Sequence, residues 1–327
     1  IGSWLFDKRR EIGFENLPSL TDVDFDSVKL VTKGRGKLQT SHITYNKNIA
    51  THITAWEKYK SALSNIKVLD PACGSGAFLN EVFDFIKNEG QKINNELTNL
   101  TGQADLFRWD THILENNIYG IDLNRESVEI TKLSLWLKTA NKNEKLTYLQ
   151  NNIKVGNSLV DDLLISTAAF QWEEEFSEIL SNGGFDIIVG NPPYIDSEEM
   201  AKSQKKERDY IAKQYSTTTG NWDIYIPFFE KSLKLLKSNT SYLSFITPDK
   251  WVSKDFGNDF RIKYVNNIQE ILILGRDVFD EAKVDSIVTT FKTINNNILE
   301  TKIFDGKTSS NLNSCEVVNV LKSPYQL

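Results

Sequence analysis

The sequence of 327 residues is long enough for one large α/β domain and an appendage, with a sizeable buried core. Hydrophobic residues make up 40% of the chain and charged residues 25%, which argues against a disordered or fibrous protein. The formal net charge is −6, whereas a domain that grips nucleic acid is usually basic, so the composition alone argues against tight binding to nucleic acid.

Cysteine usage and hydropathy bear on the compartment of the protein. The two cysteines, Cys73 and Cys315, have neither the spacing of metal ligands nor that of a disulfide framework, so we expect no metal site and a reducing compartment. No apolar run approaches the roughly 18 residues of a membrane span. We therefore expect a cytoplasmic protein without a secretory leader and, since the chain starts at Ile1 rather than Met, a part of a longer polypeptide.

Residues 1–38 are mixed in character, and we predict a partly helical N-terminal extension there. From residue 39 onward, strands alternate with helices. The predicted helices have apolar residues at helical spacing and cover residues 42–63, 78–87, 126–140 and 224–236. The predicted strands are short apolar runs at residues 66–70, 117–122, 153–155, 185–189, 241–246, 268–274 and 286–292. In the helix over 126–140, the apolar face contains Ile130, Leu133 and Leu137.

Two polar stretches interrupt this pattern. Residues 88–113 are rich in Asn and predict a helical extension or an insertion, whereas residues 195–221 predict a long polar loop or short helices. The second stretch contains a basic cluster, which suits either phosphate contacts or a solvated helix face. The cluster consists of Lys202, Lys205, Lys206, Arg208 and Lys213.

The alternation of strands and helices predicts an α/β fold with a largely parallel sheet that is covered by helices on both faces. We divide the chain into the N-terminal extension (1–38), the α/β domain (39–294) and a last segment (295–327). In the last segment Asn, Ser and Lys become frequent, and we expect a hinge into a further domain there.

The first chemical motif is a turn with two glycines between a predicted strand and a predicted helix, Val68-Leu69-Asp70-Pro71-Ala72-Cys73-Gly74-Ser75-Gly76-Ala77-Phe78-Leu79. Glycine allows a tight turn and lets a ligand approach the backbone closely. The spacing matches neither the P-loop nor the full dinucleotide fingerprint. It favours a nucleotide-like ligand without a pyrophosphate, and the alternative is a bare strand-to-helix turn.

The second motif is Asp122, at the end of the predicted strand 117–122. A carboxylate in this position can accept hydrogen bonds from both hydroxyls of a ribose. The alternative is that Asp122 caps the next helix, but Asn124 is better placed to do so. We therefore expect Asp122 to bind a ribose.

The third motif is Asn191-Pro192-Pro193-Tyr194, directly after the apolar strand 185–189. The prolines fix the backbone and remove donors, so the neighbouring carbonyls are held in place and free to accept hydrogen bonds. The Asn191 side chain adds a second acceptor, and two fixed acceptors suit a primary amine. Tyr194 adds a flat face on which a planar group can stack. The alternative is a proline-stiffened loop with an incidental Asn and Tyr.

Together these motifs resemble those of the class I, S-adenosylmethionine-dependent amino-methyltransferases. The resemblance is closest to the DNA adenine-N6 methyltransferases of restriction–modification systems in which the glycine motif precedes Asn-Pro-Pro-Tyr, and it covers roughly residues 40–293. It implies a Rossmann-like, seven-stranded, mostly parallel methyltransferase sheet, S-adenosylmethionine as the cofactor, and methylation of adenine N6 in a base flipped out of double-stranded DNA.

The resemblance also assigns cofactor contacts. Asp70, Ala72, Gly74 and Gly76 would line the methionine end of the cofactor, and Asp122 would bind its ribose. Two further contacts depart from the family pattern. Asn157 falls where the family often has an Asp against the cofactor adenine, and Thr44 falls in a Thr-Pro segment whose proline is replaced here by Tyr45.

At the reaction centre, the resemblance implies that the target amine donates to the Asn191 side chain and the Pro192 carbonyl, with Pro193 stiffening the loop. Pyramidalisation of the nitrogen would then make it nucleophilic, so positioning and electrostatics carry the catalysis. Tyr194 and Phe279 would stack on the target base. The alternative for Phe279 is a residue of the core.

Other amine methylations stay open at this point, namely of protein glutamine, of guanine in RNA and of cytosine N4. So does a non-catalytic methyltransferase-fold module that only binds DNA. Cytosine-C5 methylation is excluded, because it needs a nucleophilic cysteine in a Pro-Cys dipeptide, which the chain lacks. The resemblance further implies partners outside this chain: a DNA specificity domain or subunit and, where the protein also cleaves DNA, a nuclease domain of the same polypeptide.

Overall fold

The computed structural model describes residues 1–26, 29–33, 40–139, 149–238, 240–275, 285–294, 298–304 and 309–316. Within these ranges the main element is a nine-stranded sheet in the order β11-β10-β8-β9-β7-β6-β3-β4-β5. Strand β9 is antiparallel to β7 and β8, β11 is antiparallel to β10, and the other neighbours are parallel. The strands are β3 (Val68–Asp70), β4 (Ile118–Asp122), β5 (Ile153–Val155), β6 (Ile187–Gly190), β7 (Tyr242–Pro248), β8 (Ile268–Gly275), β9 (Ser286–Lys292), β10 (Ile298–Phe304) and β11 (Ser309–Glu316).

The strands from β5 to β8 in this order are the seven predicted from the sequence, so the α/β fold with a seven-stranded, mostly parallel methyltransferase sheet is confirmed. Strands β10 and β11 extend the same sheet. The sheet therefore continues beyond residue 295, where the sequence predicts a hinge. The division of the chain into domains stays a prediction.

The helices differ in length and in how they are placed around the sheet. They are α1 (Gly2–Ile12), α2 (Asp22–Asp26), α3 (Lys47–Asn65), α4 (Ala77–Thr101), α5 (Trp109–Asn116), α6 (Arg125–Leu137), α7 (Trp172–Glu175), α8 (Ser177–Ser181), α9 (Ser197–Ser203), α10 (Lys205–Gln214), α11 (Tyr225–Leu235), α12 (Lys250–Ser253) and α13 (Asn258–Tyr264), with 3-10 turns at Phe14–Asn16, Asp255–Gly257 and Val265–Asn267. Among the described residues, no helix is both long enough and apolar enough to cross a bilayer.

Successive residues of the central strands point to opposite sides of the sheet, and two hydrophobic cores result. Val68 and Ile187 belong to one core, together with residues of α1, α3, α4, α5 and α6. Leu69 and Ile188 belong to the other, together with residues of α11 and α13. The predicted cover of helices on both faces is therefore confirmed, and burial on both sides explains why these strands are apolar throughout.

Two helix predictions need correction. The helix expected over residues 42–63 begins only at Lys47, because Thr40–Thr44 forms strand β2 and the Asn46 side chain caps the helix by accepting from the backbone N–H of Ile49 at 2.9 Å. In α6 the apolar face with Ile130, Leu133 and Leu137 is exposed. The residues of α6 that are buried are Val128, Thr131 and Leu135.

Most of the Asn-rich residues 88–113 are helical, so the prediction of a helical extension holds, with a non-helical connection over residues 102–108. Helix α4 continues to Thr101 on a buried stripe that includes Ile93 and Leu97, and α5 packs against it. Gly90 makes this packing possible, because a Cβ at this position would lie 2.2 Å from the Trp109 ring.

The partly helical character of residues 1–38 is also confirmed, and α1 packs against the main sheet. The buried carboxylate of Asp7 accepts hydrogen bonds from the Tyr242 hydroxyl on β7 at 2.6 Å and from Lys292 Nζ on β9 at 2.7 Å. Helix α1 is therefore attached through Asp7 to β7 and β9, two strands from the C-terminal half of the chain.

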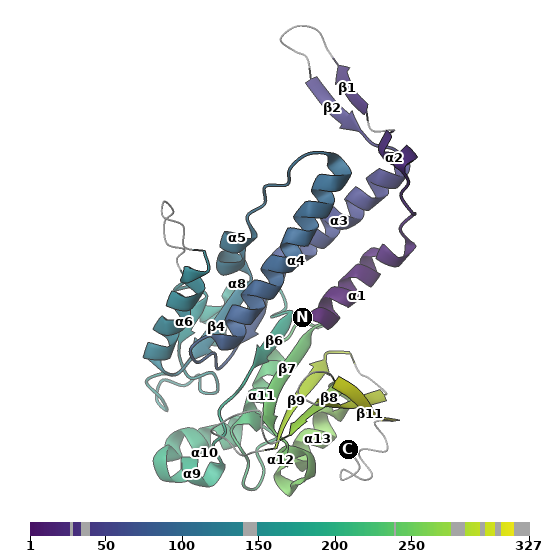
Figure 1. Ribbon diagram of the computed structural model, residues 1–327. Coiled ribbons are helices and arrows are strands. Elements are labelled where there is room, and N and C mark those ends of the chain that lie inside the picture. Colours follow the sequence, from purple (N-terminus) through teal and green to yellow (C-terminus); the bar gives the residue numbers. More distant parts are fainter. Residues whose placement is uncertain are drawn as a thin grey trace.

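Strands β1 (Lys29–Lys33) and β2 (Thr40–Thr44) form a separate antiparallel hairpin. In Figure 1 this hairpin projects beyond the far ends of the neighbouring helices α3 and α4. The Tyr45 hydroxyl, next to the hairpin, donates to the Thr101 carbonyl at the C-terminal end of α4. The glycine turn precedes the N-terminal end of α4, so this 25-residue helix, roughly 37 Å long, separates the hairpin from the turn.

Candidate active site

The candidate site is a cavity of about 380 Å³ at the carboxyl ends of the central parallel strands. Carboxyl ends of parallel strands meet at one edge of a sheet, so residues far apart in the sequence come together there. The predicted site residues that line this cavity are Ala72, Gly74, Asp122, Asn157, Asn191 and Pro193. A volume of this size suits a small organic ligand.

The glycine turn between β3 and α4 forms one side of the cavity. Gly74 and Gly76 have φ of +52° and +85°, a left-handed conformation that glycine adopts without strain. The Thr131 hydroxyl on α6 donates to the Gly74 carbonyl at 2.8 Å, and a Cβ on Gly76 would lie 2.8 Å from Thr131 Cγ2. Thr131 therefore holds the turn in place. Its sequence context, a Thr within a helix, gave no signal of this role.

Asp122 ends β4 with its carboxylate fixed by backbone donors. One oxygen accepts from the Gly74 N–H at 2.8 Å and the other from the Asn124 N–H at 2.8 Å. Asn124 caps α6 by accepting from the N–H groups of Glu126 and Ser127, so the preference for Asn124 over Asp122 as the helix cap is confirmed. Each carboxylate oxygen keeps acceptor capacity for a ligand hydroxyl.

Asp70 lies behind the cavity wall, with only 1% of its surface exposed. One carboxyl oxygen accepts from the Ala72 N–H at 3.0 Å. Burial, with a contribution from the nearby charge of Asp122, raises the pKa of Asp70 to about 7 against the effect of that hydrogen bond. The same oxygen would lie 2.6 Å from a Cβ on Gly190. Asp70 is therefore enclosed between the glycine turn and the end of β6.

Asn157 follows β5 and lines the cavity, and its side-chain oxygen accepts from the Leu159 N–H at 3.1 Å. The neighbouring Ser158 hydroxyl donates to the Pro71 carbonyl at 2.6 Å. This hydrogen bond fastens the loop after β5 to the glycine turn. Ser158 is a site residue that the sequence prediction missed, although it stands next to a predicted one.

The Asn-Pro-Pro-Tyr motif follows β6 and closes the cavity at its inner end. Asn191 and Pro193 line the cavity, whereas Pro192 is buried. The Tyr194 hydroxyl donates to the Asn191 side-chain oxygen at 2.5 Å and to the Ile246 carbonyl at 3.3 Å.

The Tyr194 ring is half-buried and packs edge-to-face on Tyr225, with ring centroids 6.2 Å apart. Burial raises the pKa of Tyr194 to about 12, so its hydroxyl stays protonated and able to donate at neutral pH. The stacking role of Tyr194 stays a prediction. The structure adds a second role for this residue, which is to hold the Asn191 side chain.

Helices α9 and α10 form the wall opposite the glycine turn, so the prediction of short helices within residues 195–221 is confirmed. This wall was missed as part of the site. Its cavity-lining residues are mostly apolar and come from α9, α10, α11 and the adjoining residues: Ile195, Met200, Gln204, Glu207, Ile211, Ile224 and Phe228. The apolar positions Met200 and Ile211 in an otherwise charged stretch are the signal that could have revealed it.

Among the described residues, Thr44 is a predicted site residue that lies away from the cavity. Thr44 ends the β1–β2 hairpin, at the far end of α4 from the glycine turn, and it is not among the residues that line the cavity. Phe279 lies outside the described residues. Gly76 caps α4 and shapes the turn without lining the cavity.

The side chains around the cavity fit a nucleoside-type cofactor. A glycine backbone at Gly74 and a pre-oriented carboxylate at Asp122 suit a ribose next to a polar group. The apolar side chains of Ile211, Ile224 and Phe228 suit the faces of a planar base. The residues that would hold S-adenosylmethionine are therefore present and converge on one space.

Comparisons with known proteins agree with this geometry. The Eco57I restriction-modification methylase family model matches residues 116–279, half of the chain. The chain is 34% identical over 216 residues to the Type II restriction enzyme and methyltransferase RM.Eco57I of Escherichia coli, which covers 60% of this chain and 21% of that protein. It is 27% identical over 247 residues to the Type II methyltransferase M.BstVI of Geobacillus stearothermophilus, which covers 74% of this chain and 38% of that protein.

Among solved structures, the Type IIL restriction-modification enzyme MmeI, in complex with DNA, matches with a TM-score of 0.60 at 14% identity. The match covers 81% of this chain and 36% of MmeI, and at this identity it shows a shared fold. This chain thus corresponds to a minor part of longer proteins, 21% of RM.Eco57I and 38% of M.BstVI. Because the family model spans β4, β5 and the Asn-Pro-Pro-Tyr motif as well as half of the sequence, the chain belongs to the Eco57I restriction-modification methylase family.

Proposed function

We propose that this chain is the methyltransferase core of a restriction–modification enzyme and that it methylates the N6 amine of adenine in DNA with S-adenosylmethionine. One observation carries the proposal: Asn191 and Pro193 line the same cavity as Gly74 and Asp122. The motif that suits an amine and the residues that suit a nucleoside therefore line one cavity. Group transfer requires this arrangement, because the two reacting groups must meet in a fixed orientation.

The cofactor, when bound, supplies a methyl group activated on a sulfonium. The protein's own contribution is to position the partners. The Asp122 carboxylate would accept hydrogen bonds from the ribose hydroxyls, and Gly74 would leave room for the cofactor because it has no side chain. The apolar wall with Phe228 would cover the cofactor's adenine base. Asp70, enclosed behind the wall, supports the turn that carries these contacts.

Asn191 holds the target amine. Its side-chain oxygen already accepts from the Tyr194 hydroxyl, and an amide oxygen has two lone pairs, so it can accept from an amine hydrogen as well. The second amine hydrogen goes to the Pro192 carbonyl, which the proline ring keeps in place. These two acceptors would favour a pyramidal nitrogen with a localised lone pair. The nitrogen would accept the methyl group as the bond between that carbon and the cofactor sulfur breaks, and the amine proton would then be released to water.

The adenine amine is paired inside a duplex, so the base must leave the stack at a cost of a few kcal/mol. Stacking on an aromatic face would offset roughly 1–3 kcal/mol of this cost. Tyr194 and Phe279 are the aromatic residues that we propose for this contact.

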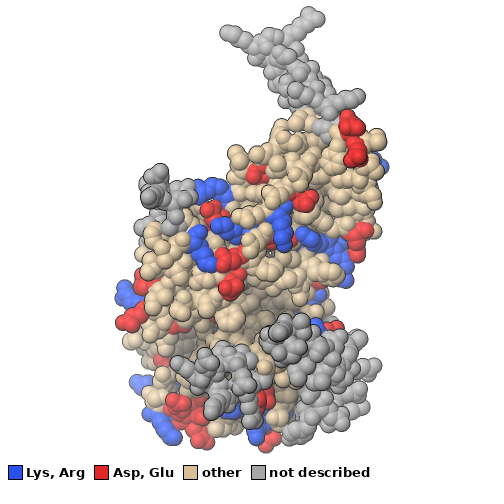
Figure 2. Space-filling view, in the orientation of Figure 1, with Lys and Arg blue, Asp and Glu red and all other residues tan. Residues whose placement is uncertain are grey.

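The charge distribution suits moderate rather than tight DNA binding by this chain. On the face in Figure 2, Lys and Arg side chains are interspersed with Asp and Glu. Lys202 lies on α9 and Lys205 and Lys206 on α10, close in sequence to the cavity-lining residues Gln204 and Glu207. We propose that Lys202, Lys205 and Lys206 contact DNA phosphates near the flipped base.

DNA is favoured as the substrate over protein or RNA by the relatives, since RM.Eco57I is a restriction enzyme and methyltransferase and MmeI is bound to DNA. Adenine is favoured by the motif order, with the glycine turn before Asn-Pro-Pro-Tyr. We further propose that the choice of DNA sequence, and any DNA cleavage, depend on parts of the protein outside residues 1–327.

Incorporation of tritiated methyl groups tests the proposal. The full-length protein is incubated with tritiated S-adenosylmethionine and unmethylated plasmid DNA, and the DNA is then digested to nucleosides and separated. We expect the label in N6-methyladenine. Label in cytosine, or no label in the DNA, would overturn the proposed substrate.

A further inference from the structure

The wall formed by α9 and α10 is attached to the opposite side of the cavity at two points. The Tyr215 hydroxyl, directly after α10, donates to the Leu159 carbonyl at 3.1 Å. The Tyr210 hydroxyl on α10 donates to the Asp161 carboxylate. Both acceptors belong to the loop after β5 that also carries Asn157. The position of α10 therefore sets how closely the two walls of the cavity approach each other.

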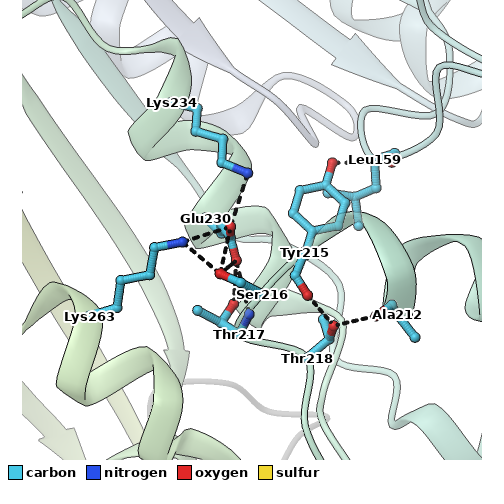
Figure 3. A network of polar contacts seen from close by, with 9 residues as sticks. All are labelled: Leu159, Ala212, Tyr215, Ser216, Thr217, Thr218, Glu230, Lys234 and Lys263. Atoms are coloured by element: carbon cyan, nitrogen blue, oxygen red, sulfur yellow. Dashed lines mark hydrogen bonds and ion pairs between the residues drawn. The ribbon is translucent and has the colours of Figure 1, made fainter.

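The segment after α10 is held by one buried carboxylate, Glu230 on α11 (Figure 3). Glu230 accepts from the Thr217 N–H at 3.1 Å, the Thr217 hydroxyl at 2.8 Å and the Ser216 hydroxyl at 3.2 Å. Its side chain is only 1% exposed. The Thr218 hydroxyl donates back to the Ala212 and Tyr215 carbonyls at the end of α10.

Two lysines balance the charge of this carboxylate. Lys234, one turn further along α11, lies 2.9 Å from it, and Lys263 on α13 lies 3.0 Å from it. Burial alone would raise the pKa of Glu230, but the hydrogen bonds from Lys234, Thr217 and Lys263 outweigh burial and lower it to about 2. Glu230 is therefore a charged, fixed acceptor at neutral pH.

Glu230 lies on the same helix as the cavity-lining residue Phe228, and Ile224, which also lines the cavity, directly precedes that helix. One helix thus supplies both part of the apolar wall and the attachment of the segment after α10. Releasing that segment would let α9 and α10 move away from Phe228 and from the loop after β5.

We propose that Glu230 is a positioning residue for cofactor binding: by holding Ser216 and Thr217 it keeps α9 and α10 closed against the cavity, and it thereby sets cofactor affinity without touching the cofactor. The inference rests on the proposed function, since it takes the cavity to be the site of S-adenosylmethionine. It adds a residue outside the three sequence motifs to the determinants of that site.

Glu230→Gln is the central variant, because it keeps the size of the side chain and removes the charge that holds five donor groups, those of Ser216, Thr217 (two), Lys234 and Lys263. If only about a tenth of the variant molecules then have α9 and α10 in the closed position, the apparent dissociation constant for the cofactor rises about tenfold. Thr217→Val removes one hydrogen bond and keeps the shape, so it should weaken binding less, by about threefold.

A matched control is Glu89→Gln. Glu89 is also buried, and like Glu230 it accepts from a hydroxyl and from two cations: the Tyr59 hydroxyl, Arg9 and Lys92. It lies on α4, however, within the helices of the other core. Loss of its charge should lower stability without altering the cavity. The dissociation constant of this variant should stay within about twofold of the wild-type value.

Calorimetric titration of the full-length protein with S-adenosylhomocysteine, which needs no catalytic turnover, decides the question. We expect weakened binding by Glu230→Gln and Thr217→Val and unchanged binding by Glu89→Gln. Equal dissociation constants for wild type and Glu230→Gln would overturn this inference alone. Failure of the wild type to bind S-adenosylhomocysteine would overturn the proposed function and this inference with it.

Amide hydrogen exchange separates a positioning role from a general loss of stability. In Glu230→Gln and Thr217→Val, amides of residues 205–214 should exchange faster, whereas those of β3 and β4 should keep their protection. An exchange increase that is uniform over the whole sheet, or none in α10, would contradict the role of Glu230 as the attachment of this wall.

Discussion

The Tyr194 hydroxyl donates a hydrogen bond to the side-chain oxygen of Asn191 at 2.5 Å. The two residues belong to one motif, yet their link depends on Tyr225, against which the Tyr194 ring packs, and on the Ile246 carbonyl, which accepts from the same hydroxyl. Asn191 is therefore oriented by its own motif partner before any substrate arrives. Orientation in advance is what a catalytic acceptor needs, because it avoids reorganisation during the reaction.

The phenylalanine variant of Tyr194 isolates this hydrogen bond. Tyr194→Phe keeps the ring and its packing on Tyr225 but frees the Asn191 side chain to rotate. We expect the methyl-transfer rate constant to fall about tenfold, equivalent to ~1.4 kcal/mol, with an unchanged dissociation constant for S-adenosylhomocysteine. Single-turnover kinetics measure the first quantity. A wild-type rate would contradict the positioning role, and Tyr194→Ala should be slower than Tyr194→Phe because it also loses the ring.

Removal of the Asn191 side chain should separate chemistry from cofactor binding. Asn191→Ala deletes the acceptor for the target amine while the glycine turn and Asp122 stay intact, so methyl transfer should be abolished and cofactor binding nearly unchanged. Tritiated-methyl incorporation and calorimetry check the two halves of this prediction. Substantial turnover by Asn191→Ala would rule out Asn191 as the amine acceptor.

Gly190 should tolerate no side chain, because a Cβ there would lie 2.6 Å from a carboxyl oxygen of Asp70. Asp70 is buried and hydrogen-bonded to Ala72, so it has little room to move. We expect Gly190→Ala to lower the free energy of unfolding by about 1–3 kcal/mol, as measured by urea denaturation. The control is Gly2→Ala, where a Cβ has no neighbour within 4 Å, and a similar loss in both variants would contradict the steric argument.

Asp70 should make the stability of the fold depend on pH. Because burial raises its pKa from 3.8 to about 7, the folded chain keeps this proton where the unfolded chain has released it. The stabilising contribution is complete below about pH 4 and is lost as the pH rises to 7. The rise in pKa corresponds to on the order of 4 kcal/mol at most.

Asp70→Asn resembles the protonated carboxyl at every pH and should lack this dependence. The free energy of unfolding of the variant, relative to wild type, should therefore increase between pH 4.5 and 7.5 in urea titrations. A constant difference across this range would show that the Asp70 carboxyl has an ordinary pKa in the folded chain.

Much of the fold was predictable because burial on both faces leaves a strong local pattern. Each central strand is an apolar run, and each carries its site residue at or just after the carboxyl end, as Asp122 does on β4. The backbone conformations of the glycine turn and of the proline pair are equally predictable from the neighbouring residues alone. These features specify the strands of the sheet and the residues at their carboxyl ends without knowledge of distant contacts.

The features that were missed depend on contacts between distant residues. Thr131 meets the glycine turn from 57 residues away, and Tyr194 meets Ile246 from 52 residues away. The exposed face of α6 gave the opposite error, because Ile130 and Leu133 form a regular apolar pattern that no described part of the chain covers. Periodicity shows which residues can be buried together, and tertiary packing decides whether they are.

The ion pair between Asp7 and Lys292 has a consequence for the order of events on the ribosome. Asp7 is synthesised 285 residues before Lys292, a delay on the order of tens of seconds at about 5–20 residues per second. During that interval α1 lacks β7 and β9, the strands on which it docks. The Asp7 carboxylate therefore lacks its two side-chain donors, Tyr242 and Lys292, until most of the sheet has been synthesised, and α1 cannot be fixed to the sheet by these contacts before then.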